Sequence, residues 1–279
     1  MRYFTILAVL LMLPAAFATE TARLQVVHNA ADPGAATVDV WVNNDLLIND
    51  LEFRKASPFL DVPAGMNLDI GIAGPASASQ SESIATFRVK LESGKRYIVV
   101  ANGVLSPGDF SVNPDSESIA FTLLVAGDGQ EYGLNGAGMV DLLILHGATD
   151  APEVDVVARG VGIIVDDLQY KEFAGYISVP AGFYTLDVTP ADNNNVGVAC
   201  YDADLSRLGG RAALVFASGF LNPAANQNGE SFGLFAALPN GQVIELPACQ
   251  EPIPEFSVIA GILAFALCIG VYGFMRLKK

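Results

Sequence analysis

Between residues 20 and 248 the chain alternates short apolar runs with clusters of turn residues. The runs are rich in Val, Ile, Leu and Phe, and Asn, Asp, Gly and Pro separate them. This pattern predicts β-strands, because branched and aromatic side chains pack well on a pleated sheet. No segment before Pro252 keeps apolar residues at helical spacing for three turns. The predicted strands cover residues 24–28, 38–42, 68–72, 84–91, 97–101 and 120–125, then 142–146, 154–158, 175–179, 185–189, 212–216 and 232–237. Asn240-Gly241 predicts a hairpin between 232–238 and 242–246, since both residues tolerate positive φ.

The strand pattern occurs twice in the same order. The matched segments are 24–32 with 142–150, 38–40 with 154–156, 50–53 with 167–170, 62–65 with 179–182, and 103–106 with 219–222. The offset is 118 at His28 and His146, 117 at Pro63 and Pro180, and 116 at Gly103 and Gly219. So constant an offset indicates two copies of one domain of about 110 residues.

The fold expected for each copy is an all-β antiparallel sandwich of about seven strands, in tandem, followed by one C-terminal transmembrane helix. Five of the thirteen residues from 127 to 139 are glycine, so this seam is expected to be a flexible, weakly packed linker between two independent domains. The predicted boundaries are 19–138 for the first sandwich and 139–248 for the second.

These repeated segments resemble the domain-of-unknown-function family 4397. The resemblance rests on an opening strand that ends in His-Asn-Ala or His-Gly-Ala, on Val-Asp-Val, and on the Val-Pro-Ala-Gly turn. Segments 198–204, 215–221 and 232–238 make the second copy the fuller match, whereas the first departs after Gly71 with the small-residue stretch 74–83. The resemblance implies an immunoglobulin-like fold in an exported protein, and it brings no catalytic residues with it.

Both ends of the chain carry targeting signals. Arg2, an apolar run over 6–13, and Ala16-Phe17-Ala18 predict a signal peptide over residues 1–18, cut between Ala18 and Thr19; an uncleaved anchor is the alternative. Residues 258–275 carry no formal charge and, at about 27 Å as a helix, nearly match the roughly 30 Å core of a bilayer. The basic tail 276–279 places the remainder outside the cell.

The stalk between the second sandwich and this helix, residues 249–257, contains Pro254-Glu255-Phe256. It resembles the PEF-type sorting signals of archaea, which implies two fates. The helix is either retained as a single-pass anchor or removed while the protein is attached to the cell envelope. Both fates place the domains at the cell surface.

The net charge of the chain limits the kinds of partner that the protein can bind. The net charge is −15, and setting aside Arg2, Arg276, Lys278 and Lys279 leaves 15 − 4 = 11 basic against 30 acidic residues, or −19. Such a surface repels nucleic acid. Cys268 lies in the predicted membrane helix, so Cys200 and Cys249 are expected to form a disulfide in an oxidising compartment, with two free thiols as the alternative.

Candidate chemistry is sparse. His28 and His146 are the only histidines and occupy the same place in each copy, where Asp39 and Asp155 on a neighbouring strand could pair with them. The simpler interpretation is a histidine that ends a strand and hydrogen-bonds its own turn. No nucleophile elbow, phosphate loop or zinc pattern is present.

Calcium is the one cofactor that the acidic composition leaves open. Residues 192–195 begin like a ligand loop but lack the later ligands, while Asp202 and Asp204 flank a strand and could join a different kind of site. No cofactor is expected otherwise.

The sequence therefore predicts a non-enzymatic surface protein that presents two sandwich domains to an extracellular protein or glycan. The alternatives are an envelope spacer without a ligand and, less favoured, an extracellular hydrolase.

Overall fold

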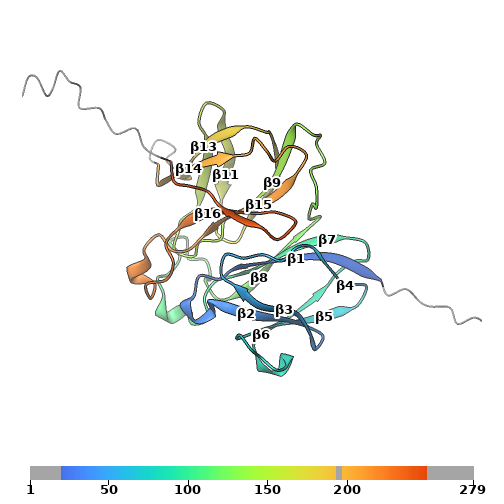
Figure 1. Cartoon of the computed structure of the whole chain (residues 1–279). Helices are drawn as coiled ribbons and strands as arrows, with labels where there is room; N and C mark the ends of the chain where they lie inside the picture. The colour runs from blue at the N-terminus through green and yellow to red at the C-terminus, as the bar shows by residue number, and fades with distance from the viewer. Residues whose placement is uncertain (1–19, 193–196, 250–279) are drawn as a thin grey trace, which may run out of the picture.

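The computed structural model describes residues 20–192 and 197–249 (Figure 1). These residues form seventeen strands and four 3-10 turns, which confirms the all-β prediction. The predicted signal peptide with its cleavage site, the sorting motif, the membrane helix and the basic tail lie outside the described residues. Within the described ranges no helix has the length and apolar character needed to cross a membrane.

The N-terminal sandwich consists of the first eight strands, arranged as two facing sheets. Their bounds are β1 (Thr21–Asn29), β2 (Thr37–Val42), β3 (Asp45–Glu52), β4 (Leu60–Pro63), β5 (Asn67–Ala73), β6 (Ser83–Lys90), β7 (Arg96–Asn102) and β8 (Thr122–Gly127), with the turns η1 (Pro33–Ala35), η2 (Gln80–Glu82) and η3 (Pro107–Asp109). One sheet has the order β4-β1-β7-β8 and the other β3-β2-β5-β6. Alternate residues such as Leu24, Val40 and Ile70 point inward from the two sheets and form a closed core.

The C-terminal sandwich repeats this plan with nine strands. Their bounds are β9 (Met139–Leu145), β10 (Val154–Ala158), β11 (Gly162–Leu168), β12 (Phe173–Pro180), β13 (Phe183–Pro190), β14 (Ala199–Asp204), β15 (Ala212–Ser218), β16 (Gly233–Ala237) and β17 (Val243–Glu245), with the turn η4 (Pro223–Ala225). The sheets have the orders β12-β9-β15-β16-β17 and β11-β10-β13-β14. The predicted hairpin at Asn240-Gly241 joins β16 to β17, which pair antiparallel.

The expectation of purely antiparallel sheets is wrong at one ladder in each sandwich. Strand β1 pairs parallel with β7, and β9 pairs parallel with β15. Neither pair is consecutive in the chain, because most of the strands between them run through the opposite sheet. No hairpin therefore forces these neighbours into antiparallel register.

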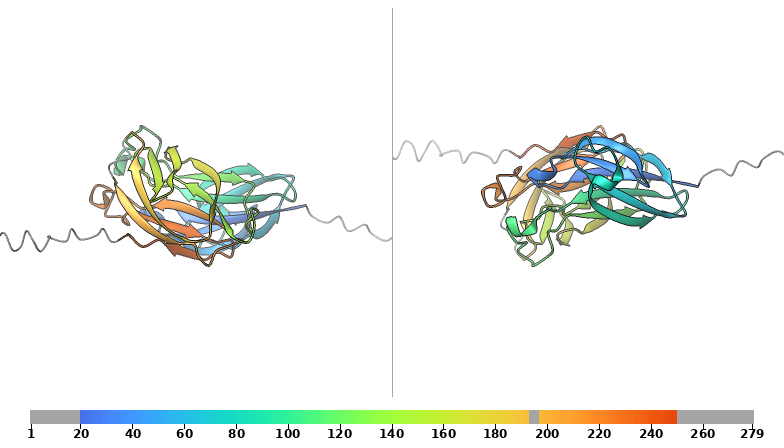
Figure 2. Two further views of the ribbon diagram at one scale, coloured as in Figure 1. Left: turned by 90° about the horizontal axis from the view of Figure 1, so that it is seen from above. Right: turned by 90° about the horizontal axis from the view of Figure 1, so that it is seen from below.

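The expectation of two independent domains on a weakly packed linker is also wrong. The sheets that contain β1 and β9 pack against each other through their outer faces, and the sandwiches lie side by side in both views of Figure 2. The buried cluster between them consists of Val27, Phe59, Ile98, Val100, Ala126, Leu143, Leu145, Leu214, Phe216, Phe235 and Ala237. Strands such as β9 are apolar on both faces because each face is covered, one by its own sandwich and one by the other.

Arg54 fastens one edge of this interface. Its guanidinium carbon lies 4.2 Å from the centre of the Phe235 ring, a cation–π contact, and its Nε donates to Ser218 Oγ at 3.1 Å. The residue also forms a long ion pair with Glu230, at 3.8 Å. A loop of the N-terminal sandwich is thus bound to the C-terminal one by stacking and hydrogen bonding.

A disulfide joins strand β14 of the C-terminal sandwich to the segment that follows β17. Cys200 on β14 is bonded to Cys249, as the cysteine count predicted. The segment after β17 runs beside β14, where Asp202 N donates to Pro247 O and Cys249 N to Cys200 O, both at 2.9 Å. Strands β17 and β14 lie at the edges of different sheets, so the segment 246–249, called the strap below, closes one side of the sandwich.

Candidate functional site: an apolar cavity in the C-terminal sandwich

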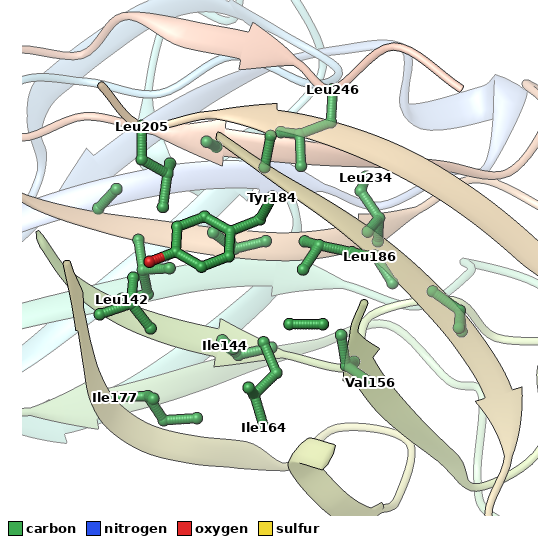
Figure 3. A pocket seen from close by; sticks show the side chains of 18 of the residues that line it. Leu142, Ile144, Val156, Ile164, Ile177, Tyr184, Leu186, Leu205, Leu234 and Leu246 are labelled. Atoms are coloured by element: carbon green, nitrogen blue, oxygen red, sulfur yellow. The ribbon is translucent and has the colours of Figure 1, made fainter. Parts of the chain in front are cut away.

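A cavity of about 700 Å³ lies between the two sheets of the C-terminal sandwich. Side chains from β9 to β17 line it, and those labelled in Figure 3 point from both sheets into a common space. Leu142, Ile144, Val156, Leu186 and Leu234 form much of the wall. Protein interiors are normally packed without voids much larger than a water molecule. The volume falls within the range of about 300–1,000 Å³ that is typical of small-molecule sites.

The exposed fractions of matched core residues show that the N-terminal sandwich is closed where the C-terminal sandwich opens. Leu24, Val26, Val38, Val40, Ile70 and Val99 are 1–3 % exposed, whereas the corresponding Leu142, Ile144, Val154, Val156, Leu186 and Val215 are 7–9 % exposed. The six side chains are apolar in both copies, so hydrophobicity does not distinguish the two interiors.

Smaller side chains at three wall positions account for much of the added space. Leu24 is paired with Tyr97 in the first copy, and its counterpart Leu142 is paired with Ala213. By the same comparison of registers, Ala203 replaces Val89 and Ala158 replaces Val42. Each replacement removes a side chain that fills the first core.

One replacement runs the other way, because Tyr184 occupies the position of Leu68. The tyrosine is only partly buried, and its hydroxyl donates to Pro180 O at 2.8 Å near the rim. Its ring is part of the lining of the cavity (Figure 3).

The cavity reaches the surface beside exposed apolar side chains. Val161, in the turn between β10 and β11, is 67 % exposed, Ile163 on β11 is 50 % exposed, and Phe183 at the start of β13 is 63 % exposed. All three also line the cavity. Exposed apolar groups grouped at the mouth of an apolar cavity are typical of a site that admits an apolar molecule.

Polar groups of the lining carry negative charge. Asp202, Asp204 and Glu245 lie among the lining residues, and no lysine or arginine does so within the described part of the chain. The hydroxyl and backbone N–H of Ser206 donate to Asp204, which lowers the pKa of that carboxyl below its usual value and keeps it ionised at neutral pH. An anionic group in the cavity would be repelled.

His146 also lines the cavity and is uncharged. Its Nε2 lies 2.9 Å from Pro152 O, and because a carbonyl only accepts, Nε2 carries the proton and Nδ1 is an acceptor. Within the described residues no donor reaches this buried Nδ1. Burial lowers the pKa of His146, which outweighs the opposing effect of the Pro152 bond.

The first histidine is satisfied by its own turn. His28 Nε2 lies 2.6 Å from Ala35 O, and Ala30 N donates to His28 Nδ1 at 3.3 Å. Burial lowers the pKa of His28 to about 4, so the ring is neutral at physiological pH. These contacts agree with the structural interpretation of the histidine at the end of the first strand.

The suggested aspartate partners bond elsewhere. Asp39 accepts from Asp50 N at 2.9 Å and from the N–H and hydroxyl of Ser77, at 2.9 and 2.7 Å. Burial raises the pKa of Asp39, but these donors outweigh it and leave the pKa below its usual value. Asp155 Oδ1 accepts from Asp167 N at 2.7 Å. Neither carboxylate has a described hydrogen bond to its histidine.

A further aspartate recurs at the same place in both copies and has a structural role. Asp32 accepts from Leu105 N at 2.8 Å, and its counterpart Asp150 accepts from Leu221 N at 2.9 Å. Each carboxylate thus holds the loop that follows the central strand of its sheet. The aspartate at the end of the repeated histidine segment is explained by this contact.

The calcium candidates from the sequence do not converge. Residues 193–196 of the suggested loop lie outside the described residues. Asp202 accepts from Thr185 Oγ1 at 2.9 Å, and Asp204 accepts from Ser206. A different group of acids does come together, at Asp155, Asp166 and Asp167.

Fold and cavity together define a tandem β-sandwich protein with one closed and one hollow domain. The model of the family described as "Domain of unknown function (DUF4397)" matches residues 22–120 and 140–227, so the chain is a tandem member of that family. This confirms the resemblance of the repeated segments. A search of curated proteins found no match to the chain.

Sequence reasoning missed the cavity, although a signal was present. Aligning the two copies places Ala213, Ala203 and Ala158 where the first copy has Tyr97, Val89 and Val42. Such a comparison requires the strand registers, because the offset between the copies changes along the chain.

Proposed function

We propose that the protein is a non-enzymatic binding protein that holds an apolar molecule inside its C-terminal sandwich. The observation that carries the proposal is the apolar cavity of about 700 Å³, which opens beside Val161, Ile163 and Phe183. Each methylene moved from water into such a space contributes about 0.8 kcal/mol. A chain-like or fused-ring hydrocarbon gives the largest gain.

The polar lining favours a neutral head group on that molecule. Asp202, Asp204 and Glu245 repel a carboxylate or phosphate that enters the cavity, because like charges repel one another. A long-chain alcohol, an isoprenoid alcohol or a similar neutral lipid carries no such charge.

Presentation at the cell surface is part of the proposal. It rests on the signal sequence over 1–18, the apolar segment 258–275 and the sorting motif at Pro254-Glu255-Phe256. In this arrangement the immunoglobulin-like sandwiches lie outside the cell membrane, and a binding protein there would collect lipid or extracellular ligands. A membrane-impermeant amine-reactive label that fails to modify the protein on intact cells would rule out the external location.

Displacement of a fluorescent probe tests the binding function. N-phenylnaphthylamine is uncharged and becomes fluorescent in apolar surroundings, so it is titrated into the purified protein. We expect saturable binding, and we expect dodecanol to displace the probe at a concentration at least about tenfold lower than dodecanoate, which corresponds to about 1.4 kcal/mol. Equal displacement by both compounds would contradict the neutral head group.

A matched pair of variants locates the probe. Ala213→Tyr restores the side chain that the closed sandwich carries at Tyr97, and we expect it to reduce probe affinity at least about tenfold. Ala224→Tyr makes the same change at an exposed site on η4 and should leave affinity unchanged. The smaller Ala203→Val serves if the tyrosine variant does not fold. Unaltered affinity in folded Ala213→Tyr and Ala203→Val would place the probe elsewhere and remove the support for the cavity as the site.

A further inference from the structure

Three carboxylates meet at a β-bulge of the C-terminal sandwich. In the ladder between β10 and β11, Val154 pairs with Leu168 and Val156 with Val165, so Asp155 faces both Asp166 and Asp167. A bulge places two residues of one strand opposite a single residue of its partner. One ligand oxygen from each of the three residues lies within 4.8 Å of the other two.

Asp155 is the buried member of this group. It is 1 % exposed, whereas Asp166 and Asp167 are exposed. Asp155 Oδ1 accepts from the backbone of Asp167, but no donor among the described residues reaches Oδ2. A buried carboxylate oxygen without a partner is costly, since the charge loses its hydration and receives nothing in return.

The N-terminal sandwich has the same bulge without this deficit. There Asp39 faces Asn49 and Asp50, between the pairs Val38–Leu51 and Val40–Ile48. Ser77 donates twice to Asp39 Oδ2, and the amide of Asn49 donates to Asp50. In the first copy, uncharged protein donors therefore satisfy these carboxylate oxygens.

Two features therefore differ in the second copy. Asp166 replaces the donor amide of Asn49 with a third carboxylate, and the described residues supply no donor in the role of Ser77. Bulge geometry is preserved, since Asp50 and Asp167 have φ angles of 53° and 51°. The backbone is thus the same, and the chemistry has changed from internal hydrogen bonding to an excess of negative charge.

We propose that Asp155, Asp166 and Asp167 bind a divalent cation of the calcium class. Calcium takes carboxylate oxygens at about 2.3–2.6 Å, so two ligands of one ion are at most about 5 Å apart, and the three oxygens here all lie within 4.8 Å of one another. Water completes the coordination on the exposed side. Three carboxylates in an open, water-accessible site match the roughly 10⁻⁴–10⁻³ M dissociation constants of extracellular calcium modules.

The bound ion fastens the edge strand β11 to β10. Both strands form part of the cavity wall, through Val154, Val156 and Leu168. The proposal itself does not depend on any cavity ligand, because the carboxylates bind the metal alone.

Calorimetric titration of calcium chloride into the purified full-length protein tests the site. We expect saturable binding of one ion with a dissociation constant of about 10⁻⁴–10⁻³ M, and weaker binding of magnesium, which demands a more rigid octahedral shell. Asp166→Asn, which copies the amide of the first sandwich, should weaken calcium binding at least about tenfold. Asp45→Asn, an exposed acid on β3, is the control and should bind as the unmodified protein does.

Thermal unfolding provides a second measurement. Calcium should raise the midpoint of the unmodified protein and of Asp45→Asn, and raise it less in Asp166→Asn, because a ligand stabilises only the state that binds it. Absence of saturable heat up to about 10 mM calcium, well above the expected constants, would overturn the proposal. Identical titrations of Asp166→Asn and the unmodified protein, or tighter binding of magnesium than of calcium, would do the same.

Discussion

The two sandwiches share a chain topology, a parallel central ladder, a bulge and a buried histidine, yet one interior is filled and the other is hollow. The shared features are backbone features, which the repeated Val-Asp-Val and Val-Pro-Ala-Gly segments specify in both copies. The interiors differ through side-chain size at positions such as Tyr97 and Ala213. The backbone topology of a β-sandwich therefore does not determine whether side chains fill its interior.

The hollow copy is supported from outside its own core. Each sandwich covers one face of the other, so this cover is common to both copies, but the Cys200–Cys249 disulfide with its strap closes one side of the hollow copy alone. The N-terminal copy has no cysteine. External support of this kind allows a domain to keep an interior volume that packing alone would not hold open.

Truncation at one matched position should show the largest difference between the copies. Ile70 and Leu186 occupy the same place, and Ile70 lies in the closed core. We expect Ile70→Ala to lower the free energy of unfolding by about 2–5 kcal/mol, and Leu186→Ala by less than about 2 kcal/mol, since the latter removes atoms that already face a cavity. Urea denaturation measures both. Equal losses would mean that the second core is as tightly packed as the first.

Removal of the disulfide should affect only the hollow copy. The bond joins residues 49 apart in sequence, and on the chain-entropy model it contributes about 4 kcal/mol. We expect Cys200→Ser combined with Cys249→Ser to lower the free energy of unfolding by about that amount. Hydrogen exchange of the amides on β5, which lies in the sheet away from the interface between the sandwiches, serves as the internal control and should change little. Reduced and oxidised protein that unfold at one urea concentration would contradict the expectation.

Acid should destabilise the protein through its two histidines. The buried His28 has a pKa of about 4, below the 6.5 of an exposed histidine, and burial lowers the pKa of His146 as well. Between these two pKa values the histidines are protonated in the unfolded chain and neutral in the folded chain. The free energy of unfolding is therefore highest above pH 6.5 and falls as the pH drops towards 4. His28 alone should account for about 3 kcal/mol at the lower limit.

Denaturation curves between pH 7 and pH 4.5 measure this dependence. In His28→Gln the slope of stability against pH should be smaller than in the unmodified protein, and His146→Gln should have a similar effect if the two rings are equally buried when folded. A slope unaffected by either substitution would assign the acid sensitivity to carboxylates.

Edge strands mark where sequence patterns stopped being informative. Strands β3, β4, β11 and β14 were not among the predicted strands, and each lies at the edge of a sheet. Edge strands are partly exposed, so their side chains mix polar and apolar types and lose the clear apolar run. Central strands such as β9 and β15, covered on both faces, were predicted close to their observed bounds.

The contact between the sandwiches was missed for a related reason. The glycines of 127–139 indicated a flexible seam. Residues 142–145 and 98–100, however, are all apolar, so they place apolar side chains on both faces of their strands. A strand buried on one face alternates, whereas these do not. The missing alternation was the signal for a second buried surface.

The sequence by itself determined the β class, the duplication, the cysteine pair and the family, because these follow from local patterns and from residues that recur at a steady offset. Tertiary structure alone decided the parallel ladders, the packing of one sandwich on the other, the cavity, and the meeting of Asp155 with Asp166 and Asp167. Each of the latter depends on which distant strands become neighbours and on the summed volume of side chains between them. Such quantities have no local pattern, since a side chain fills or leaves space only relative to what the fold places opposite it.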